Sequence, residues 1–137
     1  MELLNKNILL GVTGGIAAYK AVELLRLLKK AGANVNVIMT KSALEFVGKT
    51  TFEVLSENKV LSDLFSDTES SVTHIDLATN ADAVIIAPAT ANIIAKLKSG
   101  IADDALSTTM LAVDCPVMIC PSMNTNMYQN IQVQRNL

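Results

Sequence analysis

Apolar segments and helix-patterned segments alternate along the first part of the chain. The run Ile8–Val12 is apolar and ends at Thr13-Gly14-Gly15, which predicts a buried strand entering a tight turn. Leucines then recur at helical spacing over residues 24–28 until Gly32, which predicts a helix that ends at this glycine. Asn34–Met39 predicts a second strand, so these segments form one β-α-β unit.

The second half of the chain repeats this alternation. Asp82–Ala87 is apolar without alternation, as in a strand covered on both faces, and Pro116–Cys120 repeats the pattern of a buried strand. Between the halves, the signals from Gly48 to Val72 are mixed and predict a variable, loop-rich region. The expected helices run over Thr51–Ser56, Thr90–Lys98 before Gly100, and Asp103–Val113, and a last one begins near Asn126.

This order of elements predicts an α/β fold with a doubly wound parallel sheet in three layers and right-handed crossovers. At 137 residues, the chain is long enough for one domain and too short for two. Ligands of such sheets bind beyond the carboxyl ends of the strands. The segments that follow the strands are rich in Gly, Ser, Thr or Asn, and we expect the site in Thr13–Ile16, Thr40–Ser42, Pro88–Ile93 and Pro121–Met127.

The composition narrows the class of partner. Half of the residues are hydrophobic and 18% are charged, which excludes disorder, and a net charge of −2 with 4% aromatic residues argues against a nucleic-acid surface. No apolar run reaches the roughly 20 residues of a membrane span. One histidine and two cysteines cannot build a four-ligand zinc site, so we expect no metal. Cys115 and Cys120 are expected to be buried thiols of a reducing, cytoplasmic compartment.

The loops after the first two strands favour a phosphorylated ligand. Gly14 and Gly15 let backbone N–H groups approach an anion at a helix start, although a simple strand-to-helix turn explains them equally well. Thr40-Lys41-Ser42 stands where an NAD site usually has an acidic residue. These hydroxyls suit the phosphate or ribityl chain of flavin mononucleotide (FMN), while Lys41 leaves NADP open and capping of a short helix is the plainer alternative.

Four motifs stand in a fixed order along the chain. They are Gly11-Val12-Thr13-Gly14-Gly15-Ile16-Ala17-Ala18-Tyr19-Lys20, His74-Ile75-Asp76-Leu77, Pro88-Ala89-Thr90-Ala91-Asn92, and Pro121-Ser122-Met123-Asn124-Thr125-Asn126-Met127-Tyr128. From Ile8 onward the chain resembles the flavin-containing cysteine decarboxylases, and within them it looks most like the phosphopantothenoylcysteine decarboxylases of coenzyme A synthesis. The resemblance implies a flavodoxin-like (Rossmann-like) fold, bound FMN, and a homotrimer or a higher assembly of trimers with FMN at the subunit boundary.

The activity that this resemblance implies is that of a carboxy-lyase, converting 4′-phosphopantothenoylcysteine to 4′-phosphopantetheine. A cysteine carboxylate lacks an electron sink for the loss of CO2, and oxidation of its CH2–SH group to a thioaldehyde, with hydride passing to the flavin, supplies one. Returning the electrons afterwards leaves no net redox change. Two alternatives stay open: a peptidyl-cysteine decarboxylase of lantibiotic maturation, and a non-catalytic flavin-binding regulatory protein of the same fold.

The resemblance also assigns roles to individual residues. His74 is implied as the catalytic base, because imidazole accepts a proton near neutral pH, and Asn124 as the ligand of the substrate carboxylate. Met127 is implied on the substrate side, and Tyr128 replaces the family's usual tryptophan. The residues expected to contact the flavin are Gly14, Gly15, Ile16, Thr40, Ser42, Thr90, Ala91, Asn92, Ser122 and Met123.

Two further expectations concern the last third of the chain. Asp103 and Asp104 are assigned simply to helix capping. The family continues past Leu137 into a segment that clamps the substrate and carries a cysteine used as an acid. We therefore expect residues 1–137 to be a single FMN-binding domain without that segment, either a fragment of a longer chain or a domain limited to the oxidative half-reaction.

Overall fold

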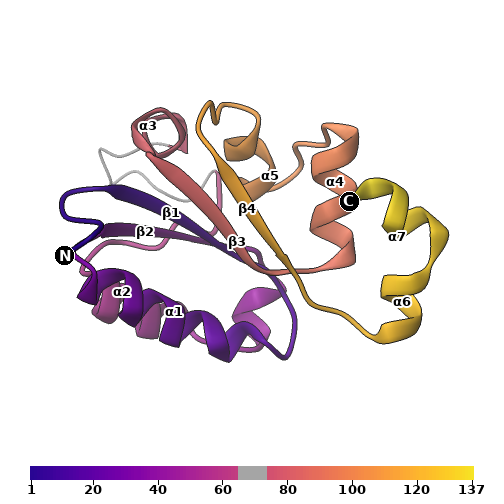
Figure 1. Ribbon diagram of the computed structural model, residues 1–137, viewed down its shortest axis with the longest axis horizontal. Helices are drawn as coiled ribbons and strands as arrows, with labels where there is room; N and C mark the ends of the chain where they lie inside the picture. Colours follow the sequence, from indigo (N-terminus) through magenta and orange to yellow (C-terminus); the bar gives the residue numbers. More distant parts are fainter. Residues whose placement is uncertain (65–73) are drawn as a thin grey trace.

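A parallel sheet forms the centre of the protein (Figure 1). The structure is a computed structural model, and it describes residues 1–64 and 74–137. Its strands are β1 (Asn7–Val12), β2 (Asn34–Met39), β3 (Ala83–Ala89) and β4 (Val117–Pro121), in the order β2-β1-β3-β4. Because β2 lies on one side of β1 and β3 on the other, the chain reverses its winding at β1, and the predicted doubly wound parallel sheet is confirmed.

Helices cover both faces of the sheet, which confirms the three layers (Figure 1). One layer holds α1 (Ala18–Lys30) and α2 (Lys49–Ser56). The opposite layer holds α3 (His74–Asn80), α4 (Ala91–Ser99) and α5 (Ala105–Met110). A short 3-10 helix, η1 (Ala43–Glu45), follows β2, and α6 (Thr125–Gln129) and α7 (Ile131–Asn136) follow β4, with α7 packed against α4.

The apolar core is divided by the sheet into two clusters. Leu10 and Val12 of β1 pack towards α1 with Leu25, while Leu9 points to the other face. This separation follows from the strand geometry, since successive side chains of a strand point to opposite faces. On the second face, Val84 and Ile86 of β3 pack against Ile93 of α4 and Leu106 of α5.

Most of the predicted elements are confirmed, and the glycine signals explain why. Gly32 (φ +97°) follows α1, and Gly100 (φ +71°) caps α4, so both helices end where the chain enters the left-handed region that glycine favours. The helix predicted over Asp103–Val113 is shorter and occupies Ala105–Met110. Within the region from Gly48 to Val72, the helix predicted over Thr51–Ser56 is present as α2, two residues longer at its start. Residues 65–72 of this region lie outside the described residues.

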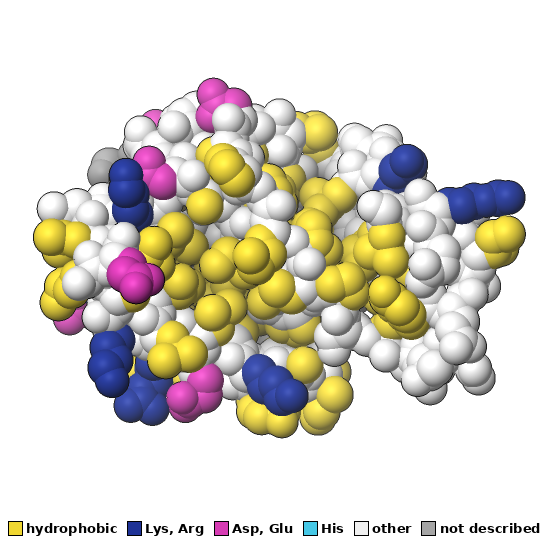
Figure 2. Space-filling model, viewed as in Figure 1, with side chains coloured by type: hydrophobic (Ala, Val, Ile, Leu, Met, Phe, Trp, Pro, Cys, Tyr) yellow, Lys and Arg dark blue, Asp and Glu magenta, His cyan; other side chains and the backbone are white. Residues whose placement is uncertain are grey.

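The prediction that β4 is buried is wrong. Met118 is 61% exposed, because α1 and α2 pack against β2, β1 and β3 on their face of the sheet and leave this face open at β4. Val117, which points to the opposite face with Val84, is 42% exposed. Met118 pairs in register with Ile85, which places both side chains on this open face. Figure 2 shows apolar side chains gathered over the same part of the molecule.

The two cysteines are free, as predicted, but both are half-buried rather than buried. Burial, together with the negative charge of Asp114, raises the pKa of the Cys115 thiol, which keeps it in its unreactive protonated form. Among the described residues, every helix is too short or too polar to cross a membrane.

Candidate functional site

A cavity of about 320 Å³ opens at the carboxyl ends of β1, β2 and β3. This is the point where the winding of the sheet reverses, the usual ligand site of such folds. Its polar lining consists of Thr13, Thr40, Lys41, Ser42, Ser62, Asp63, Thr90, Asn92, Lys96, Asp103 and Asp104. The structure thus brings together four residues predicted to contact a cofactor, namely Thr40, Ser42, Thr90 and Asn92.

Gly14 allows the loops after β1 and β2 to approach each other closely. A Cβ atom at Gly14 would lie 2.6 Å from the Ser42 Cβ atom and 2.9 Å from the Ser42 carbonyl carbon, and it would clash with the Ser42 hydroxyl. At Gly15 a Cβ atom would meet its nearest neighbours, in Pro88 and Thr90, only at 4.0 Å. Gly14 therefore shapes the cavity wall through its lack of a side chain. Ile16, the next predicted contact, is largely exposed.

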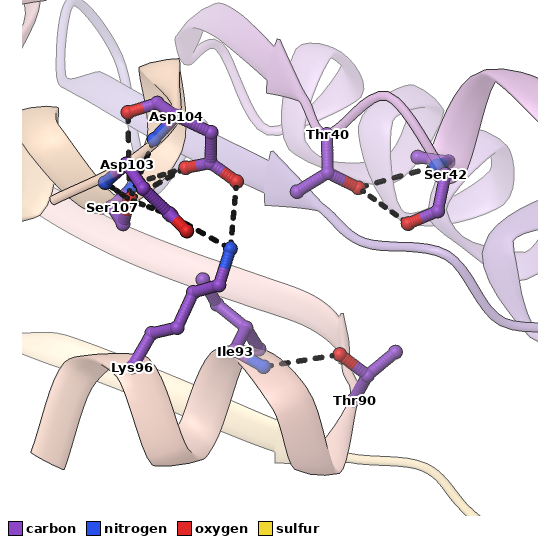
Figure 3. Close-up of polar contacts among 9 residues, drawn as sticks. Thr40, Ser42, Thr90, Ile93, Lys96, Asp103, Asp104 and Ser107 are labelled. Carbon is purple, nitrogen blue, oxygen red and sulfur yellow. Dashed lines mark hydrogen bonds and ion pairs between the residues drawn. The ribbon is translucent and has the colours of Figure 1, made fainter. Parts of the chain in front are cut away.

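The hydroxyls of Thr40 and Ser42 lie 3.3 Å apart at the end of β2 (Figure 3). Thr40 Oγ1 accepts a hydrogen bond from the Ala43 backbone N–H at 3.2 Å, so it caps η1 as predicted. Ser42 makes no capping bond, and that part of the prediction is wrong. The Ser42 side chain therefore lines the cavity but does not cap η1.

Thr90 is the N-cap of α4, and its Oγ1 accepts a hydrogen bond from the Ile93 backbone N–H at 3.2 Å (Figure 3). Ala91 is the first residue of the helix and Asn92 is exposed at its first turn. Thr13 lies in a segment that the sequence predicted for the site but was given no role of its own, and it bonds to the same turn: its hydroxyl accepts from the Thr90 backbone N–H at 3.1 Å. In the sequence, the position of Thr13 directly after the apolar strand was the feature that could have indicated a role in the site.

An ion-pair cluster closes the other side of the cavity (Figure 3). Lys96 Nζ lies 2.8 Å from Asp103 Oδ1 and 3.5 Å from Asp104 Oδ2. Asp104 caps α5 by accepting from the Ser107 backbone N–H at 2.7 Å, and the Ser107 hydroxyl completes a capping box. Asp104 therefore caps α5 as predicted and also pairs with Lys96, whereas Asp103 pairs with Lys96 and is not the capping residue, so the assignment of both aspartates simply to capping was wrong.

This cluster makes stability depend on pH. The hydrogen bond from Lys96 lowers the pKa of Asp103, so the contribution of Asp103 to the free energy of unfolding is present above about 3.8 and is lost as the pH falls through the lowered pKa. The same bond, outweighing burial, raises the pKa of Lys96, whose contribution is present below 10.5 and is lost as the pH rises above that value.

Asp103→Asn is accordingly expected to lose less stability than the unmodified protein when the pH falls from neutral into the acid range. The measurement is the free energy of unfolding from urea titrations at a series of pH values. Glu2→Gln, which changes an exposed carboxylate far along the chain, serves as the control and should keep the full acid dependence. Parallel profiles for all three proteins would contradict the assignment.

The other predicted site residues lie outside this cavity. Ser122 lines a second hollow of about 350 Å³ beside α1, and Met123 packs against the apolar cluster under α4 and α5. Asn124 caps α6 by accepting from the Asn126 backbone N–H at 2.7 Å, and Met127 is half-exposed on that helix. His74 is half-buried at the start of α3, a helix that the sequence pattern did not predict.

His74, Asn124 and Met127 are thus absent from the lining of both cavities, as far as the described part of the chain forms them. α3 was not predicted because it is a helix of only seven residues, which is too short for the spacing of its apolar residues to indicate a helix. The roles predicted for these three side chains stay predictions.

Comparison with known proteins places this geometry in a family. The family model described as Flavoprotein matches residues 1–137. The chain belongs to the Flavoprotein family. This flavoprotein is 54% identical over 134 residues to the coenzyme A biosynthesis bifunctional protein CoaBC of Bacillus subtilis (strain 168), covering 97% of this chain and 33% of that protein. The chain therefore spans about a third of the length of the curated relatives it matches.

Solved structures agree with this membership. The FMN-dependent cysteine decarboxylase SpaF superposes on this flavoprotein with a TM-score of 0.91 at 33% identity, over 98% of this chain and 78% of that one. A PPC decarboxylase mutant complexed with pantothenoylaminoethenethiol gives a TM-score of 0.83 at 30% identity, over 96% and 75%. The resemblance drawn from the four motifs and the flavodoxin-like fold are both confirmed.

Proposed function

We propose that this flavoprotein is an FMN-dependent carboxy-lyase that decarboxylates 4′-phosphopantothenoylcysteine to 4′-phosphopantetheine in coenzyme A biosynthesis. The observation that carries the proposal is the 54% identity to CoaBC over 97% of the chain. The identity to the peptidyl-cysteine decarboxylase EpiD, over 97% of the chain, is only 26%, which favours the small-molecule substrate over a peptide.

The residues around the main cavity fit FMN. A phosphate and a ribityl chain need many hydrogen-bond partners and a cation, and the cavity offers the hydroxyls of Thr40, Ser42 and Thr90, the amide of Asn92, and Lys41. No carboxylate follows β2 directly, in contrast to an NAD site. Because Gly14 has no Cβ atom, the loop that carries Ser42 can lie close to the loop after β1, with the Ser42 hydroxyl beside these hydrogen-bonding groups.

In this mechanism FMN, when bound, supplies a reversible two-electron acceptor for the thiol-bearing carbon of the substrate. His74 accepts the thiol proton at an imidazole nitrogen during this oxidation. The Asn124 side chain donates an N–H to the substrate carboxylate and orients it, which needs no buried cation. When the bond to CO2 breaks, its electron pair forms a C=C bond from the α-carbon and the C=S electrons move to sulfur, so that an enethiol results. Return of the two electrons stored in the oxidation step, together with two protons, reduces this enethiol to the thiol of 4′-phosphopantetheine.

We also propose that the protein forms a homotrimer or a higher assembly of trimers. At β4, Met118 on the open face and Val117 on the opposite face expose apolar surface of the kind that protein contacts cover. In addition, His74 and Asn124 lie away from the cavity of their own chain, which fits an active site completed between copies. A cytoplasmic location fits the two free thiols.

Met118→Lys is expected to dissociate this assembly, because a buried lysine without a partner is strongly disfavoured at an interface. The measurement is the sedimentation coefficient across a range of protein concentrations. Val54→Lys is the matched control: Val54 is 69% exposed on α2, away from the open face, and its substitution should leave the assembly intact. A Met118→Lys protein that sediments like the unmodified one would refute this interface.

The activity itself is tested in a single turnover. Protein loaded with FMN is mixed with 4′-phosphopantothenoylcysteine without oxygen, and we expect release of CO2 together with a transient loss of the visible absorbance of the oxidised flavin, which returns when the enethiol is reduced to 4′-phosphopantetheine. A peptide ending in cysteine, tested in parallel, should release much less CO2. Faster release from the peptide would favour the lantibiotic-type reading, and FMN binding without CO2 from either substrate would favour a regulatory protein.

A further inference from the structure

A buried hydroxyl joins two loops that are distant in the sequence. Thr13 is 1% exposed, and its Oγ1 donates a hydrogen bond to the Pro88 carbonyl oxygen at 2.6 Å while accepting one from the Thr90 backbone N–H at 3.1 Å. The partners are 75 and 77 positions away along the chain. The Thr13 side chain thereby supplies a hydrogen-bond partner both to the Pro88 carbonyl oxygen and to the Thr90 backbone N–H.

This link continues the connection between β1 and β3 beyond the sheet. The parallel register of the two strands ends at the pair Gly11 and Ile86, two residues before Thr13 and Pro88. Beyond that pair, the hydrogen bonds of the Thr13 hydroxyl connect the two chain segments in place of the backbone hydrogen bonds of the strands. They hold the loop after β1 at a set distance from the first turn of α4.

That first turn carries the cavity residues Thr90 and Asn92. Thr90 takes part in two hydrogen bonds. Its backbone N–H donates to the Thr13 hydroxyl, and its own Oγ1 accepts from the Ile93 backbone N–H and so caps α4. Without the Thr13 hydroxyl, the turn would keep its cap but lose its attachment to β1. The N-terminus of α4 could then shift as a unit relative to Gly14 and Gly15.

We propose that Thr13 is a positioning residue for the cofactor: it sets the spacing between the loop after β1 and the start of α4, and through that spacing it controls the affinity for FMN. The inference rests on the proposed function. It assigns Thr13 no contact with the reacting atoms. Its effect reaches FMN through Thr90 and Asn92.

The test compares FMN affinity in Thr13→Val and Thr13→Ser. Valine keeps the volume of threonine but leaves the Pro88 oxygen and the Thr90 N–H unpaired, so we expect the dissociation constant for FMN to rise by about tenfold or more. Serine restores the hydroxyl and should return the constant to within about threefold of the unmodified protein. The measurement is a titration of flavin fluorescence quenching, which needs no turnover.

Thr109→Val is the matched control. Thr109 is also buried, at 0% exposure, and its Oγ1 also donates to a carbonyl at 2.6 Å, but the acceptor is Ala105 within α5. Its loss should lower the melting temperature while leaving FMN affinity unchanged. Equal FMN affinity in Thr13→Val and in the unmodified protein would overturn the positioning role, as would an equal loss of affinity in Thr109→Val.

Three further outcomes separate loss of fold, loss of the proposed function and loss of this inference. If Thr13→Val does not fold, Thr13→Cys replaces it: a thiol is a weaker donor than a hydroxyl, so affinity should fall from Thr13→Ser to Thr13→Cys, and equal affinities would refute the inference. An unmodified protein that binds no FMN would overturn the proposed function and this inference with it. Binding by the unmodified protein with no effect of Thr13→Val overturns the inference alone.

Discussion

Replacing His74 by asparagine is expected to abolish CO2 release from 4′-phosphopantothenoylcysteine while FMN stays bound. Asparagine matches the polar shape of histidine but cannot take up a proton near neutral pH, and the loss of a general base slows such steps by about 100-fold to 10,000-fold. FMN should remain because His74 begins α3 and does not line the cavity with Thr40, Ser42 and Thr90. The measurements are the single-turnover rate of CO2 release and the flavin content of the purified protein.

Thr79→Ala provides the control on the same helix. The Thr79 hydroxyl donates back to α3, at the Ile75 carbonyl oxygen and the Asp76 carbonyl oxygen, so its removal disturbs the helix without changing the proposed base. Its rate of CO2 release should stay close to that of the unmodified protein. If His74→Asn releases CO2 at the unmodified rate, another group is the base.

Gly14→Ala should give the largest loss of FMN binding among single substitutions in the loops. Its new Cβ atom would overlap the Ser42 side chain and press on the Ser42 backbone, which lies 2.9 Å away. Overpacking of this kind costs about 1–3 kcal/mol, and here the strain is relieved by moving the Ser42 loop out of the donor set. We expect FMN affinity to fall by about tenfold or more, measured by fluorescence titration.

Gly48→Ala is its control, because a Cβ atom at Gly48 meets nothing within 4 Å and the backbone there has an ordinary φ of −70°. This variant should bind FMN normally and keep its stability. Should Gly14→Ala bind FMN with unchanged affinity, the close approach of the two loops would be irrelevant to the cofactor. A thermal melt of the apoprotein separates loss of fold from loss of binding.

Local signals account for what could be predicted. The bounds of β2 match the prediction residue for residue, and α1 and α4 end at Gly32 and Gly100 as predicted. In each case the decisive residues lie within one turn or one strand of each other, so the pattern and the structure depend on the same few positions. The loops Thr40–Ser42 and Thr90–Asn92 were found for the same reason, since they directly follow apolar strands.

The misses share a different cause. β4 is as apolar as a buried strand, but its exposure depends on how far α1 and α2 extend across the sheet. Asp103 resembles a capping residue until Lys96, seven positions earlier, is brought to 2.8 Å from it by the turn at Gly100. Thr13 has no visible partner in the sequence near it, because Pro88 and Thr90 reach it only through the pairing of β1 with β3.

The amino-acid sequence by itself determined the order of strands and helices, the doubly wound α/β class, and the strand-end loops in which a ligand would bind. Those features rest on interactions between residues a few positions apart. Only the tertiary structure decided which polar side chains meet, as Thr13 does with Thr90 and Lys96 with Asp103, and which apolar side chains, such as Met118, stay uncovered. Those contacts depend on strand order and on how the layers pack, and many join residues too far apart in the chain for a local pattern to record.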